Sequence, residues 1–302
     1  MKVEFTTVDV FTGARFGGNP LAVVTNAQGL ASGQMQSIAA EFNLAETTFV
    51  LPPRDAAHTA EVRIFTPKAE IPFAGHPNVG TAFVLGRAGE SYGRKIVGDK
   101  LVFEEKAGLV PIDIERQGGN VTGARLAAPQ KLALGDEVSA EIVAALAGVP
   151  VNEIETRNHP PILGSCGIGF MFAELRSREV LAKAMYNADA FAKHLPMNKA
   201  TGVHLYVPAA EHGVEIQSRM FAPLYGVPED PATGSANVAL IGLLAQLRPE
   251  ADLTFARTIG QGFDMGRPSI LRASAEKKAG QITATCIGGR CVPMLKGTIE
   301  LS

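Results

Sequence analysis

The chain has 302 residues, enough for one large domain or for two domains of about 150 residues each. Apolar residues make up 46% of it and charged residues 19%, so we expect a folded protein rather than a disordered one. Its 28 basic and 30 acidic side chains nearly balance, which argues against nucleic acid or a membrane surface as partner and favours a small molecule.

Hydrophobic patterning predicts mixed strands and helices in the first half. Alternating apolar residues predict a hairpin of residues 2–11 and 20–24, joined by a Gly-rich turn. Apolar residues spaced i, i+3, i+4 and i+7 predict a helix at 32–43. The other elements predicted here are strands at 47–51 and 60–66, a buried helix at 79–85 with Gly86 as its C-cap, and short strands between 95 and 126.

The second half repeats this mixture. The predicted elements are a helix at 137–147 followed by Gly148, strands at 167–175, 202–207 and 214–221, and helices at 177–195 and 235–245. The last of these helices has almost no polar face. A helix that is apolar all round is usually buried at the centre of its domain.

Several other functions find no support in the sequence. No run of 18 apolar residues and no signal-like N-terminus occurs, so we expect a soluble, cytoplasmic protein. Three cysteines, Cys166, Cys286 and Cys291, are an odd number and are expected to be free thiols that pack in the protein. Motifs for P-loop, zinc-protease, thioredoxin-like, hydrolase and dinucleotide sites are missing, and nothing requires a cofactor or a metal.

An internal repeat is the most informative feature. Residues 63–67, RIFTP, recur as RMFAP 156 positions later, and the Ile-Pro at 71–72 recurs as Val-Pro at the same shift. HPNVGTA, residues 76–82, recurs as DPATGSA at a shift of 154. We interpret this as two homologous halves, which commonly pack about a pseudo-twofold axis and would bring the two loops to one cleft.

Both loops have the chemistry of an anion site. Each places Gly and then Thr or Ser at the start of an apolar helix, where unpaired N–H groups and the positive end of the helix dipole are exposed. Glycine lets a ligand approach the backbone closely, so Gly75, Gly80 and Gly234 are candidate binding residues. Such a pair of helix starts would bind a carboxylate and stabilise charge developing on a substrate.

Three ionisable residues are candidates for catalysis. His76 and Asp230 occupy matching positions of the repeat, so they would face one pocket. Glu46 lies in an apolar setting at a helix-to-strand junction, where partial burial would suit a proton shuttle. Ordinary alternatives remain for each: Asp230 as an N-cap, His76 as a turn residue and Glu46 as a solvated side chain. Asn19, in GGNP, is a turn former or a ligand.

Five segments together resemble the PhzF-like isomerase family of phenazine biosynthesis. They are GGNPLAVV, FNLAETTFV, RIFTPKAEIPFAGHPNVGTA, PEDPATGSAN and the closing GGRCVPMLKGTIEL, and they extend over essentially the whole chain. The resemblance implies an α+β fold like that of diaminopimelate epimerase. In that fold two pseudo-twofold-related halves each wrap a curved mixed sheet round a central helix, with the active site between them. We expect the halves to be residues 1–126, completed by a strand at 291–302, and residues 127–290.

The same resemblance implies a function. It assigns Glu46 as the principal acid and base, with His76 and Asp230 assisting, and Gly234 and Ser235 contacting the substrate carboxylate. The family isomerises a dihydro-hydroxyanthranilate without a cofactor, by moving a proton and a double bond in the ring. Family analogy also favours a homodimer. In the related epimerases, the helix-initiating loops carry two cysteines, whereas here the cysteines lie elsewhere, which disfavours a two-thiol racemase.

Two alternatives stay open. One is an amino-acid racemase or epimerase on the same fold, and the other is a small-molecule-binding protein without catalytic activity. Labelling of a single reactive cysteine would favour the first, and ligand-induced stabilisation without turnover would favour the second.

Overall fold

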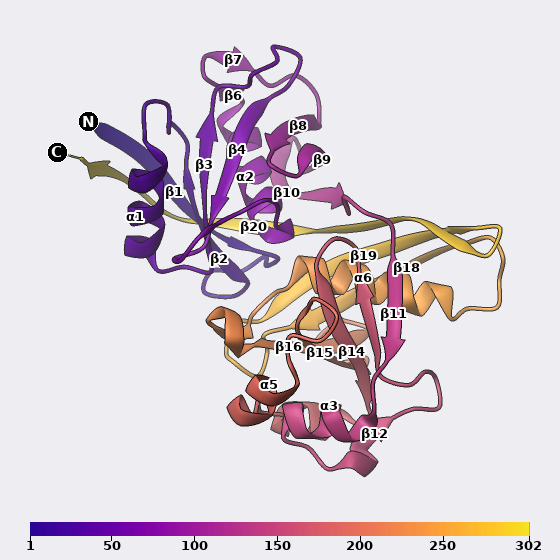
Figure 1. Cartoon of the computed structure of the whole chain (residues 1–302). Helices are drawn as coiled ribbons and strands as arrows, with labels where there is room; N and C mark the ends of the chain where they lie inside the picture. Colours follow the sequence, from indigo (N-terminus) through magenta and orange to yellow (C-terminus); the bar gives the residue numbers. More distant parts are fainter. Residues whose placement is uncertain (302) are drawn as a thin grey trace. The chain divides into compact units, whose positions relative to one another are not determined.

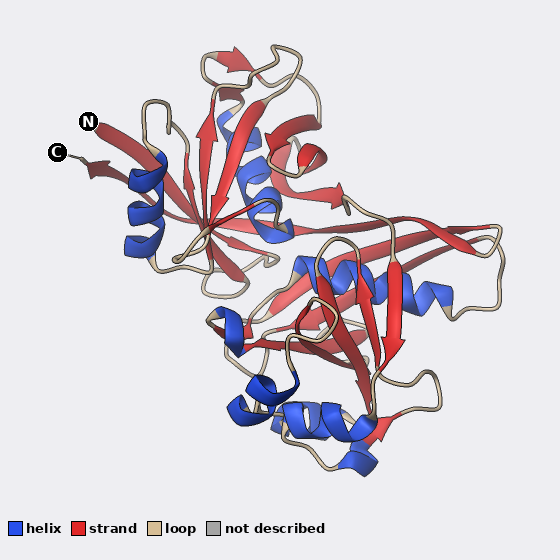
Figure 2. Ribbon diagram, in the orientation of Figure 1, coloured by secondary structure: helices blue, strands red, loops and turns tan. Residues whose placement is uncertain are grey.

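The computed structural model describes residues 1–301, except for the side chains of Thr201 and Tyr225, and the chain forms two compact units (Figure 1). Unit 1 contains Met1–Ala127 and Gly288–Ser302, and unit 2 contains Ala128–Ile287. Each unit has a mixed sheet with helices (Figure 2). Neither unit contains a helix, among the residues described, that is long and apolar enough to cross a membrane.

Among the residues that the structure describes, unit 1 has ten strands of its own and two helices. The helices are α1 (Ser32–Phe42) and α2 (Gly75–Ala88). The strands are β1 (Lys2–Val10), β2 (Asn19–Val24), β3 (Glu46–Leu51), β4 (Ala60–Phe65), β5 (Glu70–Ile71), β6 (Glu90–Ser91), β7 (Arg94–Lys95), β8 (Lys100–Glu105), β9 (Gly108–Gln117) and β10 (Asn120–Ala127). The last strand of the chain, β20 (Gln281–Glu300), begins in unit 2 and ends in unit 1.

The strands of unit 1 close into a barrel. β1 and β2 form the predicted antiparallel hairpin, β2 pairs in parallel with β3, and β3 pairs antiparallel with β4. β4 then pairs in parallel with β8, which continues through the antiparallel pairs β8–β9 and β9–β10. β20 pairs with both β10 and β1, so no edge of this ring remains open.

The two helices of unit 1 cover opposite faces of its sheet. α1 packs Met35 and Ile38 on the outer face, against Phe49 and Phe65. α2 lies on the inner face and contacts β10, β1, β2 and β9. Twelve of its 14 residues are buried, which is the physical reason for its lack of a polar stripe.

Unit 2 has the following elements. Its helices are α3 (Ala140–Ala147), α4 (Arg178–Lys183), α5 (Ala188–His194) and α6 (Gly234–Gln246), with 3-10 turns at Val151–Glu153 and Pro223–Tyr225. Its strands are β11 (Ala133–Glu137), β12 (Ile154–Glu155), β13 (Ile162–Ser165), β14 (Gly169–Leu175), β15 (Ala200–Pro208), β16 (Ile216–Ala222), β17 (Val227–Asp230), β18 (Leu253–Gln261) and β19 (Ser269–Lys278).

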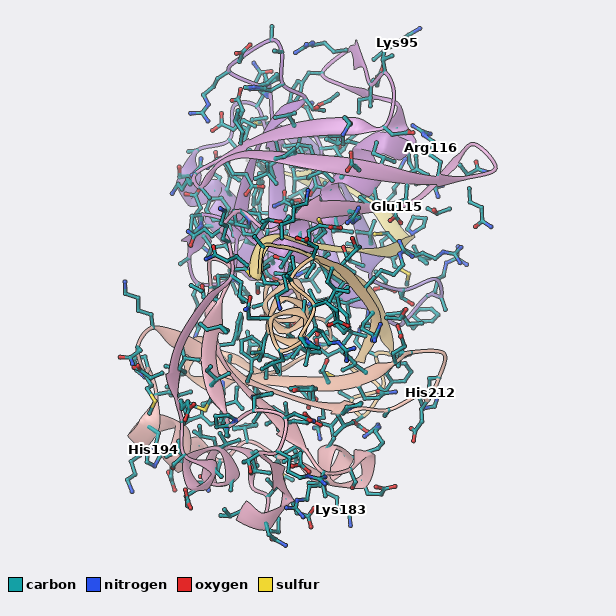
Figure 3. The ribbon with its side chains drawn as sticks, turned by 90° about the vertical axis from the view of Figure 1, so that its right-hand side faces the viewer. Lys95, Glu115, Arg116, Lys183, His194 and His212 are labelled. Carbon is teal, nitrogen blue, oxygen red and sulfur yellow. The ribbon has the colours of Figure 1, made fainter. Side chains whose placement is uncertain are left out.

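Unit 2 repeats the pairing order of unit 1. β13–β14 is antiparallel, β14–β15 parallel, β15–β16 antiparallel, β16–β18 parallel and β18–β19 antiparallel. α6 takes the place of α2 on the inner face, and α3, α4 and α5 pack against the outer face. Figure 3 views α6 almost end-on, with strands of unit 2 around it, while labelled polar side chains such as Lys183 and His212 lie at the periphery.

Two predicted helix boundaries were wrong. The helix predicted at 79–85 begins at Gly75 and ends at Ala88, with Gly89 rather than Gly86 as its left-handed C-cap. A Cβ on Gly86 would lie 2.7 Å from the Cδ1 atom of Ile114, so this glycine allows close packing instead. The helix predicted to start at residue 137 begins at Ala140, because the side chain of Ser139 caps it.

The single helix predicted at 177–195 is two helices, α4 and α5. The guanidinium of Arg219, on β16, donates to the backbone oxygens of Leu181, Ala182 and Ala184. These carbonyls belong to the last turn and the C-cap of α4, where backbone oxygens run out of helical N–H partners. A residue 35 or more positions away in the sequence therefore ends the helix, which local periodicity cannot reveal.

Candidate active site

Glu46 and His76 are brought together in unit 1. Glu46 is the first residue of β3, and His76 is the second residue of α2. The Nδ1 atom of His76 lies 3.4 Å from Oε2 of Glu46. Both side chains are largely shielded from solvent, with 5% of the His76 side chain and 18% of the Glu46 side chain exposed. A titratable pair with limited water access is suited to proton transfer.

His76 is a neutral imidazole at physiological pH. Burial lowers its pKa to about 3, an effect that a hydrogen bond with the backbone of Pro20 only partly opposes. The contact with Glu46 is therefore between a carboxyl and a neutral ring rather than between opposite charges. The Nε2 atom of His76 is buried and has no hydrogen-bond partner among the described residues, so it can accept or donate one bond to a ligand.

The start of α2 is an uncapped helix terminus beside this pair. Its N-cap, Ala74, has no side chain that could bond the first N–H groups. Gly75, the first helical residue, is buried. Asn19, at the start of β2, is 1% exposed and follows Gly18, whose left-handed φ of +66° suits glycine. Asn19 is thus buried in the same unit as Glu46 and His76.

Asp230 in unit 2 is held by its own hydrogen-bond network. It ends β17 and is 8% exposed, and its Oδ2 atom accepts a 2.6 Å bond from Oγ1 of Thr233. Gln261, the last residue of β18, donates from Nε2 to the backbone oxygen of Asp230 and to Oγ1 of Thr233. This second bond orients the hydroxyl, so the proton of Thr233 points at Asp230.

Gly234 and Ser235 begin α6 directly after Thr233. Thr233 is the N-cap residue, but its side chain makes no cap bond because it bonds Asp230 instead. The N–H groups of the first turn of α6 therefore lack a side-chain cap, as those of α2 do. Each unit presents a helix start suited to an anion, together with at least one ionisable side chain.

The structure corrects the register of the internal repeat. Arg63 forms a two-bond fork with Glu70, and Arg219 forms the same fork with Glu229. The arginines are 156 positions apart, but the glutamates are 159 apart, so the second half has three extra residues between them. Helix starts keep the shift of 159: Asn78 donates to the oxygen of Ala74, and Asn237 donates to that of Thr233, each at 3.0 Å.

With this register His76 and Asp230 are not equivalent. Ile71 pairs with Ile64, and Asp230 pairs with Met220, so Asp230 corresponds to Ile71. His76 corresponds to Ser235, 159 positions later. The argument that repeat symmetry pairs the two ionisable residues was therefore wrong. The signal that would have given the correct register is GHPNV matched with GSANV.

Gly80 also has a different role from the predicted one. It lies inside α2, and a Cβ there would be 2.5 Å from Cδ2 of Leu21 and 2.8 Å from Cγ2 of Val10. The absent side chain lets α2 approach β1 and β2, and the backbone N–H of Gly80 is within the helix. Gly80 is therefore a packing residue and not a ligand.

The three cysteines lie outside the first turns of α2 and α6, and the residues that the structure describes form no metal site there. Cys166 is buried beside Thr285, and burial raises its pKa, which leaves the thiol protonated and poorly nucleophilic. Within residues 1–301 the structure contains no group of three or more His, Cys, Asp or Glu side chains placed to hold a metal ion. A cavity of about 1070 Å³ in unit 1 is lined mainly by β1, the later turns of α2 and residues 293–298, and Glu46 and His76 are not among the residues that line it.

Comparisons with known proteins agree on one family. A family model described as "Phenazine biosynthesis-like protein" matches residues 8–297. An uncharacterized isomerase of Mesorhizobium japonicum is 36% identical, and the match covers 98% of both chains. The trans-2,3-dihydro-3-hydroxyanthranilate isomerase of Pseudomonas chlororaphis is also 36% identical, with 99% of both chains covered.

Solved structures share the fold. A phenazine biosynthesis protein of the PhzF family from Bacillus anthracis matches with a TM-score of 0.85 at 23% identity, covering 100% of both chains. A hydroxyproline epimerase from Agrobacterium vitis matches with a TM-score of 0.63 at 12% identity, covering 99% of this chain and 92% of the other. The predicted α+β class is confirmed at the level of a mixed sheet closed into a barrel with helices.

Proposed function

The chain belongs to the phenazine biosynthesis-like protein family and is an isomerase, as its sequence motifs indicated, and from this premise we propose that it rearranges a small carboxylate-bearing ring. The substrate we propose is trans-2,3-dihydro-3-hydroxyanthranilate or a close analogue, because several full-length relatives carry that name. The reaction moves a proton and a double bond within the ring and uses no cofactor.

Glu46 is the proposed acid and base. Its carboxylate takes a proton from a ring carbon, the electron pair of that C–H bond forms a new C=C bond, and the existing double bond shifts along the ring. The same carboxyl then returns the proton to the far carbon, so atoms and charge balance without an external reactant. The observation that carries this proposal is the Glu46–His76 pair, shielded from water, with a neutral histidine.

The other candidate residues are proposed to bind and orient the substrate. Nε2 of His76 would bond the substrate, since it is buried without a partner among the described residues. In the same reaction Asp230, Gly234 and Ser235 would hold the polar substituents, with the uncapped start of α6 favouring the carboxylate. Asn19 and Gly75 are proposed as further contacts. The matched Arg–Glu forks and Asn caps support our further proposal that the two units arose by duplication.

The test is turnover of trans-2,3-dihydro-3-hydroxyanthranilate in D₂O, followed by NMR. We expect the wild type to form product that contains solvent deuterium, and Glu46→Gln to lower kcat about 10²- to 10⁴-fold. Glu41→Gln is the matched control, because Glu41 is an exposed glutamate on α1. Full turnover by Glu46→Gln would remove Glu46 from the mechanism, whereas wild-type product without deuterium would show that Glu46 returns the abstracted proton before it exchanges with solvent.

The fold shared with a hydroxyproline epimerase makes a racemase the second candidate. Such activity through thiols requires an accessible, ionisable cysteine, whereas Cys166 is buried with a raised pKa and Cys291 is also buried. Inactivation by iodoacetamide that tracks labelling of one cysteine would favour the racemase. Unchanged isomerase activity after complete labelling would favour Glu46.

A further inference from the structure

Glu105 is a buried carboxyl that the proposed reaction does not use. It is the last residue of β8 and is 5% exposed. Neither of its oxygens has a hydrogen-bond partner among the described residues, although the amide of Asn78 lies near. An ionised carboxylate in such a place would be strongly disfavoured, so the site requires an explanation.

Strand register identifies a counterpart of Glu105 in unit 2. β4 pairs in parallel with β8, and β16 pairs in parallel with β18, with matching residues 156 positions apart. Glu61 is opposite Glu104, and Gln217 is opposite Gly260, so Glu105 corresponds to Gln261. The neighbouring asparagines correspond as well, since Asn78 and Asn237 both donate to the N-cap carbonyl of their helix.

Gln261 shows what this position does. Its Oε1 atom accepts from the backbone N–H of Thr233 and from Nδ2 of Asn237, at 3.1 and 2.7 Å. Its Nε2 atom donates to the backbone of Asp230 and to the Thr233 hydroxyl. One amide thus fixes the start of α6 and the orientation of Asp230. Only a group with both a donor and an acceptor can make such a set of bonds.

A protonated carboxylic acid has the same donor and acceptor pair as an amide, and nearly the same shape. We propose that Glu105 is a positioning residue that acts as a neutral acid and holds Asn78 and the first turn of α2, and through them His76. This inference rests on the proposed function only in its catalytic consequence. The state of the proton can be tested without any substrate.

The surroundings favour the neutral acid. On the strands beside Glu105, the charged side chains point to the other face of the sheet and pair with one another there. Arg54 pairs with Glu61 and Glu104, and His58 also pairs with Glu104. Glu70 pairs with Arg63 and Lys106. On β9 Glu105 is opposite Gly108, and the charged residues Asp113, Glu115 and Arg116 lie toward the far end of that strand. On the first turn of α2 the titratable group is His76, which is itself neutral. Burial raises the pKa of Glu105 to about 8.

Thermal unfolding against pH tests the protonation state. The folded protein holds the proton up to about pH 8, whereas an ordinary Glu loses it near pH 4.5. Stability of the wild type is therefore reduced progressively as pH rises from about 4.5 to 8. The Glu105→Gln variant has no proton to lose at this position. We therefore expect the difference between its Tm and the Tm of the wild type to increase from about pH 4.5 to pH 8 and to stay constant at higher pH.

Glu104→Gln is the matched control, one residue away on the opposite face. Arg54, His58 and backbone N–H groups hold the pKa of Glu104 at about 2, despite burial. Its variant should lose Tm at neutral pH, and the loss should shrink as the pH falls below 4.5. A Tm difference for Glu105→Gln that does not change between pH 5 and 8 would show that Glu105 is ionised and overturn the proposal.

Kinetics test the positioning role. Glu105→Leu, which cannot hydrogen-bond, is expected to lower kcat about tenfold or more with little change in KM, because α2 no longer holds His76 in place. Glu105→Gln is expected to restore kcat and to abolish any loss of activity between pH 7 and 9. Equal kcat for Glu105→Leu and the wild type would overturn the positioning role. Absence of isomerase activity in the wild type would instead contradict the proposed function and leave the thermal result standing.

Discussion

The protonation states of single buried residues govern this site. His76 can neighbour Glu46 without forming an ion pair because burial removes its charge. His204 in unit 2 behaves in the same way: burial lowers its pKa to about 4, and its Nε2 atom bonds Asn237. His76 lies in the first turn of α2 and His204 bonds Asn237 of α6, and both are neutral in the range where the enzyme is expected to work.

Acid is therefore expected to destabilise the protein through His76. The unfolded chain binds a proton near the ordinary pKa of 6.5, while the folded chain resists protonation down to about pH 3. Unfolding thus becomes easier as pH falls through this window, by about 2 kcal/mol between pH 6.5 and 5. Urea denaturation at several pH values checks this slope, which His76→Asn should reduce. An unchanged slope in that variant would mean that His76 is charged in the folded protein.

Thr233 is expected to control Asp230. Its hydroxyl donates to Oδ2 of Asp230, and a hydrogen bond to a charged group contributes about 1.5 to 3 kcal/mol. Thr233→Val keeps the shape but removes the donor, so kcat/KM for the isomerisation should fall about tenfold or more. Thr233→Ser keeps the donor and is the control. Equal kcat/KM for Thr233→Val and Thr233→Ser would show that the hydrogen bond does not control Asp230.

At the scale of elements, a glycine within α2 sets how closely that helix packs, and an arginine on β16 ends α4. Gly80 allows α2 to lie close to β1 and β2, and Arg219 ends α4. The corresponding Arg63 binds Glu70, Ser32 and no helix-end carbonyl that the structure describes. The two Arg–Glu pairs thus make the same hydrogen bonds to each other, but Arg219 also binds the end of a helix.

Replacing Gly80 is expected to destabilise unit 1. Gly80→Ala puts a methyl group against Leu21 and Val10, and overpacking of this kind costs about 1 to 3 kcal/mol. Gly33→Ala on α1 is the control, because its Cβ would meet no atom within 4 Å and alanine favours a helix. Chemical denaturation followed by circular dichroism compares them. A Gly80→Ala protein as stable as the wild type would show that α2 has room to shift.

Arg219 is expected to matter more than Arg63. Arg219→Met leaves Glu229 and three helix-end carbonyls without their partner, and breaking a buried ion pair costs about 3 to 5 kcal/mol. Arg63→Met is the matched variant, and its loss should be smaller because the Arg63 side chain is 20% exposed against 10% for Arg219. Hydrogen exchange in α4 should rise only in the Arg219 variant. Equal exchange in both would contradict its role in ending α4.

At the scale of the whole molecule, each unit is a barrel of strands around one buried helix. Unit 1 is completed by the far end of β20, which pairs with β1 from Lys2–Glu300 to Val10–Cys291. Unit 2 is joined at the corresponding place by β11, which pairs with β13. Residues distant in the sequence thus close the sheet of unit 1, whereas unit 2 is one continuous segment, Ala128–Ile287.

Removal of residues 291–302 is expected to unfold unit 1. Without this segment β1 would present an open edge, and the apolar side chains facing α1 and α2 would become accessible. Limited proteolysis should cut residues 1–127 rapidly while 128–287 stays protected. Glu300→Gln is the control, because the Lys2–Glu300 pair is exposed and worth under about 1 kcal/mol. Protection of both units in the truncated chain would contradict the prediction.

Local chemistry in the sequence determined the element types, the family and the candidate residues Glu46, His76 and Asp230, because periodicity, helix signals and short motifs depend on neighbouring residues. Tertiary structure alone decided the register of the repeat, the packing role of Gly80, the break between α4 and α5, and the burial of Glu105 near Asn78. These features depend on strand pairing and on burial. Residues far apart in the sequence pair, bury carboxyl groups and end helices, so the neighbouring sequence does not reveal them.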